Sequence, residues 1–295
     1  MVGKRTFGGQ IAYAAIILIM IVLMIVTVYP FLHVLFASLS DPVEVMRTRG
    51  VILAPLGDIT FAAYKAVMDN PMVLIGYRNT LFYVVTATAL NVLMTILGAY
   101  ALSRKNFMLK TPILFMIIFT MWFHGGLIPR YLLVSQTLGL QDNPLSLIVP
   151  GMISTINLII LRTAFEGVPP ALEEAARMDG ANDFQILWKV MLPMCIPTLA
   201  VIILFYAVHH WNAWFDAMLF IRNREWYPLQ IVLREILVTN STESMTTGAA
   251  AGDVMPIGET IKYAIIIVAT VPILFIYPFL QKYFVKGVMI GAIKE

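Results

Sequence analysis

Four polar side chains interrupt an apolar stretch in the last third of the chain: His209, His210, Asn212 and Asp216. If the stretch is helical, the separations of three and four residues put His209, Asn212 and Asp216 on one face. Beside Trp211 they would suit a path for a sugar, which offers hydroxyl groups for hydrogen bonds and a ring for stacking on an aromatic side chain. The alternative is equally open. Such side chains also suit the outer interface of a membrane, where Asn212 would bond a neighbouring helix.

A second polar interruption is His124, which stands before Gly125 and Gly126 in another apolar stretch. We treat His124 as a further candidate for the same path, and the two glycines would allow a kink or a close approach between helices. Asn91 and Asn157 lie in apolar stretches of their own. Because a lone amide in a membrane helix commonly bonds a neighbouring helix, we expect interhelical hydrogen bonds there rather than solute contacts.

Chemistry that needs a recognisable motif is missing from the sequence. The chain has no G-x-x-x-x-G-K-[ST] phosphate loop, no H-E-x-x-H zinc motif and no G-x-S-x-G nucleophile elbow. Its one cysteine, Cys195, excludes an intrachain disulfide and a cysteine-based metal site. We therefore expect no catalytic residue, no metal and no cofactor in this chain, so energy for any work must come from another subunit or from a gradient.

Composition shows where these side chains must sit. Of the 295 residues, 60% are hydrophobic and 13% are charged, whereas a soluble domain has about 45–50% apolar and about 25% charged residues. This excludes an ordinary soluble protein, a disordered chain and a nucleic-acid binder, and a net charge of +3 is too small to argue for polyanion binding. The sequence indicates an integral membrane protein.

Six runs without Asp, Glu, Lys or Arg locate the expected membrane spans. Each run has at least 19 residues, and a helix of about 20 residues crosses the hydrocarbon core. The first run is longer than the apolar core of a signal peptide, and no clear cleavage site follows it. Continuous apolar runs also argue against a β-barrel, so we expect an all-α, polytopic membrane protein. The six predicted helices cover about 11–33, 79–101, 112–134, 145–162, 196–220 and 260–281.

The placement of Lys and Arg sets the expected orientation. With the N-terminus inside, the cytoplasmic segments hold more basic than acidic residues, and the rest of the chain holds more acidic than basic residues. Both termini should therefore be cytoplasmic. Residues 41–78 and 221–259 then form long outer connections, the first irregular because it is rich in proline and glycine, and residues 163–193 form a cytoplasmic loop.

That cytoplasmic loop carries clear helix signals. Pro169 and Pro170 fit the start of a helix, and Glu173 and Glu174 fit its first turn, where the helix dipole favours negative charge. Gly180 should end this helix. A capping box formed by Asn182 and Gln185 should then begin a second helix, which Pro193 should break.

The second helix of the loop should carry an apolar stripe made of Phe184, Leu187, Trp188 and Met191. An exposed apolar stripe usually marks a contact surface for another protein. The alternative is that the stripe packs against the ends of the chain's own spans.

The spacing of the loop resembles the EAA loop of ABC-importer permeases. In that family Glu-Ala-Ala is followed after three residues by Gly, then after nine by Ile, and after one more by Leu-Pro. The departure in this chain is valine at the isoleucine position. The matching residues are Glu174, Ala175, Ala176, Gly180, Val190, Leu192 and Pro193.

The resemblance implies that the loop is a coupling helix that docks in a groove of a cytoplasmic ATPase subunit. Glu174 would make polar contact with the ATPase, and Ala175 and Ala176 would permit close approach. Gly180 would form the turn, and Leu192-Pro193 would fix the loop to the fifth span.

Other segments resemble carbohydrate-importer permeases of the maltose type, closest to the subgroup associated with complex oligosaccharides and lipoprotein-dependent uptake. The segments that carry this resemblance are 124–135, 205–222 and 227–238. It implies a type I ABC-importer transmembrane domain in a bacterial cytoplasmic membrane. It also implies a second permease subunit, most simply in a heterodimer, two ATPase subunits that bind ATP and Mg, and an extracytoplasmic solute-binding protein.

The expected function is thus that of a permease subunit that takes up a sugar, with ATP hydrolysed elsewhere and the outer loops 41–78 and 221–259 as the docking surface. One alternative is an importer for a non-sugar solute. Another is a secondary transporter, which would need internal repeats and coupling carboxylates at the bilayer midplane. No repeat is visible, and Asp216 is the one candidate carboxylate. A membrane-embedded enzyme would need a catalytic constellation, which the sequence lacks.

Overall fold

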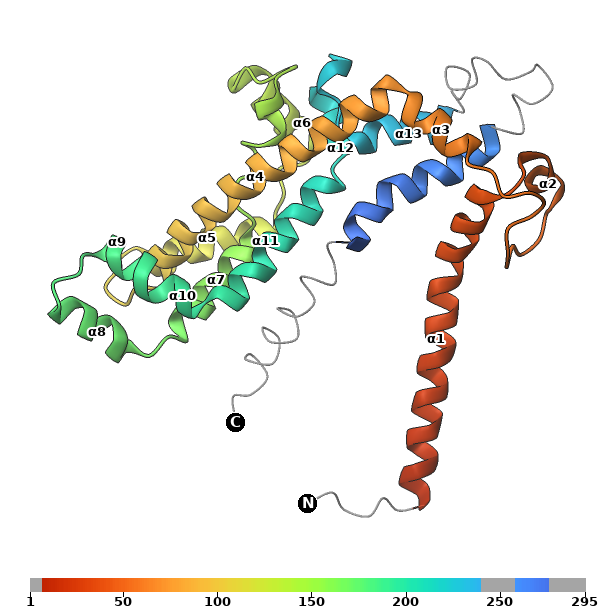
Figure 1. Ribbon diagram of the computed structural model, residues 1–295. Helices are drawn as coiled ribbons and strands as arrows, with labels where there is room; N and C mark the ends of the chain where they lie inside the picture. Colours follow the sequence, from red (N-terminus) through yellow and green to blue (C-terminus); the bar gives the residue numbers. More distant parts are fainter. Residues whose placement is uncertain (1–6, 240–257, 276–295) are drawn as a thin grey trace. The chain divides into compact units, whose positions relative to one another are not determined.

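The computed structural model describes residues 7–239 and 258–275, and Figure 1 shows that the ordered elements are helices. No residue in these two ranges lies in a β-strand. The all-α class expected from the sequence is confirmed for this part of the chain. Two compact units share the described residues: 7–71 with 233–239 and 258–270, and 72–232 with 271–275. A single domain over residues 1–295 stays a prediction.

The first unit is built on α1 (Phe7–Leu39), a helix of 33 residues without a charged side chain. No residue in its most apolar window of 18 residues is buried, so the side chains of α1 are suited to contact lipid or another protein. At its end, the hydroxyl of Ser38 lies 2.6 Å from that of Tyr64 in α3 (Ala62–Asp69). This bond fixes the connection 41–78 to the end of the helix.

The predicted irregular connection 41–78 is partly helical. Asp41 caps the short helix α2 (Pro42–Arg47), and α3 follows after an irregular segment. The next long helix, α4 (Pro71–Ser103), begins eight residues before the predicted span at 79. Proline is tolerated in the first turn of a helix, and Pro71 therefore starts α4 instead of breaking the connection.

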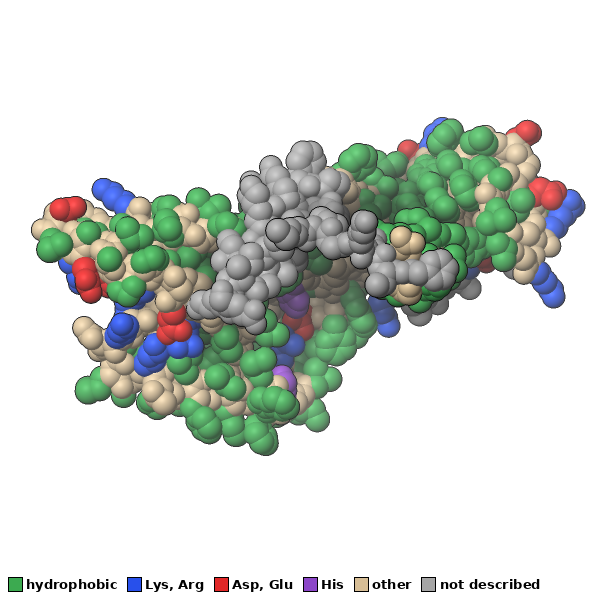
Figure 2. All heavy atoms as spheres, turned by 90° about the horizontal axis from the view of Figure 1, so that it is seen from below, with side chains coloured by type: hydrophobic (Ala, Val, Ile, Leu, Met, Phe, Trp, Pro, Cys, Tyr) green, Lys and Arg blue, Asp and Glu red, His purple; other side chains and the backbone are tan. Residues whose placement is uncertain are grey.

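The second unit has its core between α4, α7 (Thr155–Glu166) and α11 (Ile196–Trp211). Lipid tails are as apolar as leucine, so these helices gain from tight packing rather than from leaving water. Hydrophobic side chains also cover much of the face in Figure 2, while charged side chains gather in separate groups. The buried contributors to this core from the three helices are Ile96, Ala99, Leu102, Leu158, Leu161, Phe165, Ile202 and Tyr206.

Three described helices are long and apolar enough to cross a membrane: Gly8–Leu39, Pro71–Ser103 and Gly258–Phe275. Two further pairs of helices pass the same test together but are sharply bent, at 116° (Lys110–Trp122 with Leu127–Thr137) and at 87° (Asp183–Met194 with Ile196–Trp211). The described residues therefore supply three to five candidate spans, and the number six stays a prediction. The last predicted span, 260–281, runs beyond the described residues after Phe275.

The prediction of one continuous helix over 112–134 is wrong. The helix α5 (Lys110–Trp122) ends before His124, and the chain resumes as α6 (Leu127–Leu132) and a π-helix (Leu133–Thr137). Gly126, with φ +85°, adopts a conformation that a helix does not contain. Of the two outcomes expected at these glycines, a kink or a close approach between helices, the structure shows the kink, with the helices on either side bent by 116°.

The prediction of a helix over 145–162 is also wrong in its first half. Residues 144–147 form a single 3₁₀ turn, and the α-helix α7 begins only at Thr155. The Pro150-Gly151 pair between them disfavours a helix. With 12 residues, α7 is about 18 Å long, which is shorter than the hydrocarbon core.

The predicted helix 196–220 is interrupted as well. The helix α11 ends at Trp211, with Asn212 as its C-cap, and a separate short helix α12 (Phe215–Phe220) follows. A run free of charge reveals that a segment is apolar, but it does not reveal whether the helix within it is continuous.

Candidate functional site

The first helix of the loop 163–193 is α8 (Pro170–Met178), as its two prolines predict. Pro169 is the N-cap and Pro170 the first helical residue, where a missing N–H costs nothing. Glu173 lies in the first turn, as expected, and Glu174 follows it. The helix therefore presents two neighbouring carboxylates about 100° apart around its axis.

The turn after α8 is made by Gly180, which confirms the sequence prediction. Its φ is +81°, and a side chain placed on it would meet no atom within 4 Å. The need for glycine is thus conformational, because an L-residue in this region costs about 1–2 kcal/mol. The predicted capping box is also present: Asn182 N–H donates to Gln185 Oε1 at 3.0 Å, and Gln185 N–H donates to Asn182 Oδ1 at 2.9 Å.

The second helix of the loop has three parts: α9 (Asp183–Ile186), a π-helix (Leu187–Met191) and α10 (Leu192–Met194). Pro193 has no N–H for the ordinary helical bond, which favours a π-turn before it. The prediction that Pro193 ends this helix is wrong by two residues. The break falls at Cys195, where α11 begins with a proline in its own first turn.

The apolar stripe of this second helix divides between the two expected interpretations. Leu187 and Met191 are 1% and 2% exposed and pack into the core of the second unit. Phe184 and Trp188 are 69% and 44% exposed. One half of the stripe therefore anchors the loop to the chain's own helices, and the other half faces outward.

The predicted coupling residues also divide by exposure. Glu174, Ala175, Gly180 and Pro193 are exposed. Ala176 and Leu192 are half-buried and pack against the same core as Leu187. Within the described residues, the carboxylate of Glu174 makes no hydrogen bond or ion pair.

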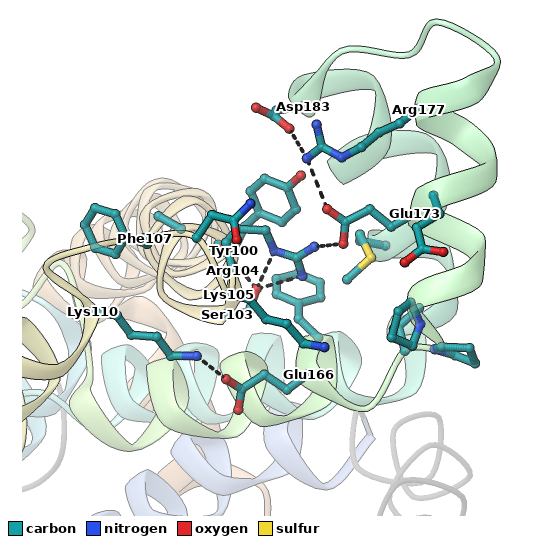
Figure 3. A pocket seen from close by; sticks show the side chains of 18 residues that line it. Tyr100, Ser103, Arg104, Lys105, Phe107, Lys110, Glu166, Glu173, Arg177 and Asp183 are labelled. Carbon is teal, nitrogen blue, oxygen red and sulfur yellow. Dashed lines mark hydrogen bonds and ion pairs between the residues drawn. The ribbon is translucent and has the colours of Figure 1, made fainter.

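A chain of ion pairs, which the sequence did not predict, joins the loop to the end of α4 (Figure 3). Arg104 pairs with Glu173, and Glu173 accepts a bond from Arg177 at 3.1 Å. Arg177 also pairs with Asp183 at 2.7 Å, so the chain continues from α8 into α9. The position of Glu173 beside the motif was visible in the sequence, but its partner is 69 residues away.

A second ionic cluster lies at the end of α7. Glu166 accepts bonds from Lys110, at the start of α5, and from Arg162, each at 2.7 Å. Partial burial alone would raise the pKa of Glu166, but the two cations outweigh it and lower that pKa below its usual value. The carboxylate therefore stays ionised, and it ties α5 to α7.

These charged groups surround a pocket of about 990 Å³, shown in Figure 3. Its walls come from the end of α4, the start of α5, the end of α7 and the loop helices α8 and α9. Both signs of charge line it, including Lys105 and Glu174.

The candidates for a solute path do not share one face. Because α11 ends at Trp211, the predicted alignment of His209, Asn212 and Asp216 is wrong. The side chain of Asn212 donates to its own helix, at Val208 O, over 2.9 Å. Asp216 pairs with Arg130 of α6 at 2.7 Å.

The other candidates differ in exposure. Trp211 is buried and lies beside the ring of Tyr77, with centroids 6.3 Å apart. His209 and His124 are exposed, and His124 sits in the break between α5 and α6. Among the described residues, neither histidine forms a hydrogen bond or an ion pair with Asp216.

Asn91 and Asn157, which we expected to form interhelical hydrogen bonds, differ in their hydrogen-bond partners. Asn91 of α4 lies 3.0 Å from the imidazole Nε2 of His210 in α11, which confirms the expected interhelical bond. Asn157 bonds through its backbone N–H to Ser154 in its own N-cap, and its side chain makes no interhelical bond within the described residues. The sequence prediction therefore holds for Asn91 alone.

The described part of the loop 221–259 is hydrogen-bonded to α4. Asn79 donates to the carbonyls of Glu225 and Tyr227 at 2.6 and 3.0 Å, and Leu229 N–H donates to the hydroxyl of Thr80 at 2.8 Å. A side chain on Gly76 would lie 2.9 Å from Leu229 Cα. Residues 240–257, the rest of the predicted docking loop, lie outside the described residues.

Asp142, whose backbone is left-handed, joins the segment before residue 144 to the segment that follows α12. Asp142 has φ +58°, and its Oδ1 accepts bonds from the N–H groups of Arg222 and Asn223, each at 2.8 Å. These two backbone bonds are the main reason that the pKa of Asp142 lies below its usual value. Its own N–H donates to Phe220 O at 2.7 Å.

Comparison with known proteins agrees with this arrangement. Residues 106–290 match the family described as binding-protein-dependent transport system inner membrane component. The polygalacturonan/rhamnogalacturonan transport system permease protein YtcP of Bacillus subtilis is 37% identical over 92% of this chain and 93% of its own length. Protein LplC of the same species is 38% identical over 91% and 90%.

A solved structure is also similar. It is a crystal structure of a bacterial ABC transporter involved in the import of the acidic polysaccharide alginate. The matching chain is 34% identical, with a TM-score of 0.88, and the match covers 96% of this chain and 100% of that one.

Proposed function

The chain belongs to the family of binding-protein-dependent transport system inner membrane components, and from this premise we propose that it is the permease subunit of an ATP-driven oligosaccharide importer. Its relatives are named for polygalacturonan, rhamnogalacturonan and alginate transport, so fragments of these polymers are the first solutes to test. The chain itself would hydrolyse no ATP.

The observation that carries this proposal is the divided surface of the cytoplasmic loop. Its inward half is anchored by Leu187 and Met191, while Glu174, Phe184 and Trp188 face outward. An exposed surface that combines apolar side chains with polar ones is typical of a contact surface that another protein covers.

The partner we propose for that surface is a cytoplasmic ATPase subunit. Glu174 would make the polar contact, Ala175 would allow close approach, and Gly180 would set the turn. Ala176 and Leu192-Pro193 would hold the loop against the fifth span, which is supported by the packing of Ala176 and Leu192 on the core.

The complete importer would contain a second permease subunit, two ATPase subunits that bind ATP and Mg, and an extracytoplasmic binding protein that delivers the sugar. The outer segments 41–78 and 221–259 would receive the binding protein. For contact with the sugar we propose the exposed His124 and His209. Trp211, Asn212 and Asp216 are the further candidates for this path.

We place the chain in a bacterial cytoplasmic membrane with both termini in the cytoplasm. This topology is supported by contacts that join segments predicted to lie on one side. Arg104 with Glu173 joins two inner segments, and Asp142 with Arg222 joins two outer ones.

Glu174→Arg tests the proposal, with Asp179→Arg as the control because Asp179 is another exposed carboxylate of the same loop and stands at a variable position of the motif. Both variants are expressed together with the partner subunits and the binding protein of the importer. We expect Glu174→Arg to lose ATP-dependent uptake of polygalacturonan fragments while it still inserts in the membrane, and Asp179→Arg to keep uptake. Normal uptake by Glu174→Arg would refute the coupling role.

A further inference from the structure

The helix α8 and the helix that follows it are held to the membrane part in different ways. The π-helix Leu187–Met191 is anchored by apolar side chains buried in the core of the second unit. In contrast, α8 has no buried residue. Ala176 of α8 is half-buried and packs against the same core, and the ion pairs of α8 add the polar contacts that help to fix its position.

Glu173 makes the shielded contact between α8 and the end of α4. The side chains of Glu173 and Arg104 are 23% and 19% exposed, whereas those of Arg177 and Asp183 are 50% and 64% exposed. Exposed ion pairs contribute little, because water and salt screen them. Removing one partner of a shielded pair costs more, since the other charge is left without compensation.

Contacts with Ser103 and Tyr100 hold the side chain of Arg104 in place independently of its ion pair with Glu173. Its Nε and Nη2 donate to the hydroxyl of Ser103 at 3.1 and 2.9 Å, and its guanidinium lies 4.6 Å from the centre of the Tyr100 ring (Figure 3). A planar guanidinium fixed on two sides loses little further freedom when it binds a carboxylate. The positive charge of Arg104 is therefore held in a fixed position at the end of α4.

The two neighbouring glutamates of α8 consequently have different surroundings. Glu173 turns toward Arg104, and Glu174 is exposed without a partner among the described residues. If a partner protein moves the exposed side of α8, Glu173 moves with the helix. The ion pair then passes this movement to Arg104.

We propose that the Arg104–Glu173 pair is the joint through which movement of α8 is passed to α4, which makes Glu173 a positioning residue and leaves the ATPase contact to Glu174. This inference rests on the proposed function, because it assumes that an ATPase subunit moves α8. It assigns to α4 a direct mechanical link to the loop that does not run through the fifth span.

The test compares Arg104→Gln, Glu173→Gln and the double variant in the complete importer, reconstituted in liposomes with its partner subunits and binding protein. Uptake of polygalacturonan fragments and ATP hydrolysis are measured together. We expect each variant to import about fivefold less sugar per ATP, a typical size for a coupling residue. Because both side chains act in one pair, the double variant should be no worse than either single variant.

Arg177→Gln is the matched control, since it removes an exposed partner of the same carboxylate and leaves the Arg104 pair intact. It should import sugar per ATP as the wild type does, and all variants should retain their ATPase subunits on purification. Unchanged import per ATP in Glu173→Gln would overturn the proposal, as would multiplying losses in the double variant. Loss of the ATPase subunits would also overturn it, because it would show a merely structural role.

Failure of the proposed function gives a different result. In that case the wild-type complex takes up none of the fragments. The stimulation of ATP hydrolysis by the binding protein can still be measured and compared between the wild type and the variants. A joint at Arg104–Glu173 predicts that this response is lost in Glu173→Gln and kept in Arg177→Gln. An equal response in both variants would overturn the joint by itself.

Discussion

Arg130 and Asp216 are 86 residues apart in the sequence, and their side chains form an ion pair of 2.7 Å between α6 and α12. Each of these short helices follows a break in an apolar segment. The pair therefore links two interrupted segments, and it occupies the carboxylate that the sequence offered as a solute contact.

We expect Asp216→Asn to destabilise the protein slightly. The side chains of Arg130 and Asp216 are 43% and 29% exposed, and partly exposed pairs contribute about 1 kcal/mol or less. Thermal unfolding in detergent should show the same small loss for Arg130→Gln, for Asp216→Asn and for the double variant. If Asp216→Asn abolishes uptake while Arg130→Gln does not, Asp216 contacts the solute instead.

We expect the stabilising effect of Asp142 to depend on pH. Its pKa is lowered in the folded state, so its contribution is present above the unfolded pKa of about 4 and is lost as pH falls through the lower folded pKa. Asp142→Asn keeps an acceptor oxygen and tolerates the positive φ, but it does not titrate.

The measurement for Asp142 is the melting temperature of wild type and Asp142→Asn between pH 7 and pH 3. The two should differ by a constant amount at neutral pH, and the difference should change only at the acid end. Asp142→Ala, which lacks the acceptor, should melt below both at neutral pH. A difference that changes between pH 6 and pH 7 would contradict this account.

Gly76→Ala should destabilise the protein by about 1–3 kcal/mol, the usual cost of overpacking. The added methyl group would lie 2.9 Å from the Cα atom of Leu229, and backbone cannot move aside easily. Gly98→Ala is the matched control in the same helix, because its nearest atom is the side-chain Cδ1 of Leu158 at 3.0 Å, which can shift. Thermal unfolding of both variants tests the difference, and equal melting temperatures would contradict the close approach of Leu229.

Local signals in the sequence were reliable because they act over a few residues. The prolines at 169–170, the glycine at 180 and the Asn182–Gln185 capping box were each found where predicted. A cap depends on backbone groups within one turn, so its residues can be recognised without knowledge of the fold.

Features that depend on the rest of the fold were not predictable in the same way. The breaks before α6 and after Trp211 lie in stretches that are apolar throughout, and apolarity alone does not fix helix continuity. The Arg104–Glu173 pair depends on how α4 and α8 meet. The sequence therefore located the two helices of the loop 163–193, but their attachment to α4 came from the structure.

Gly180→Ala should reduce retention of the ATPase subunit more than it lowers the melting temperature. At φ +81° an alanine costs about 1–2 kcal/mol, and the loop can avoid this cost by opening the turn, which would move Glu174 relative to Trp188. Gly180→Asn should behave closer to wild type, because asparagine tolerates left-handed backbone. Gly167→Ala, at an ordinary helical φ of −78°, is the control that should change neither property. Retention of the ATPase subunit and the melting temperature are measured for all three variants. Full retention by Gly180→Ala together with a lowered melting temperature would show that this turn serves stability alone.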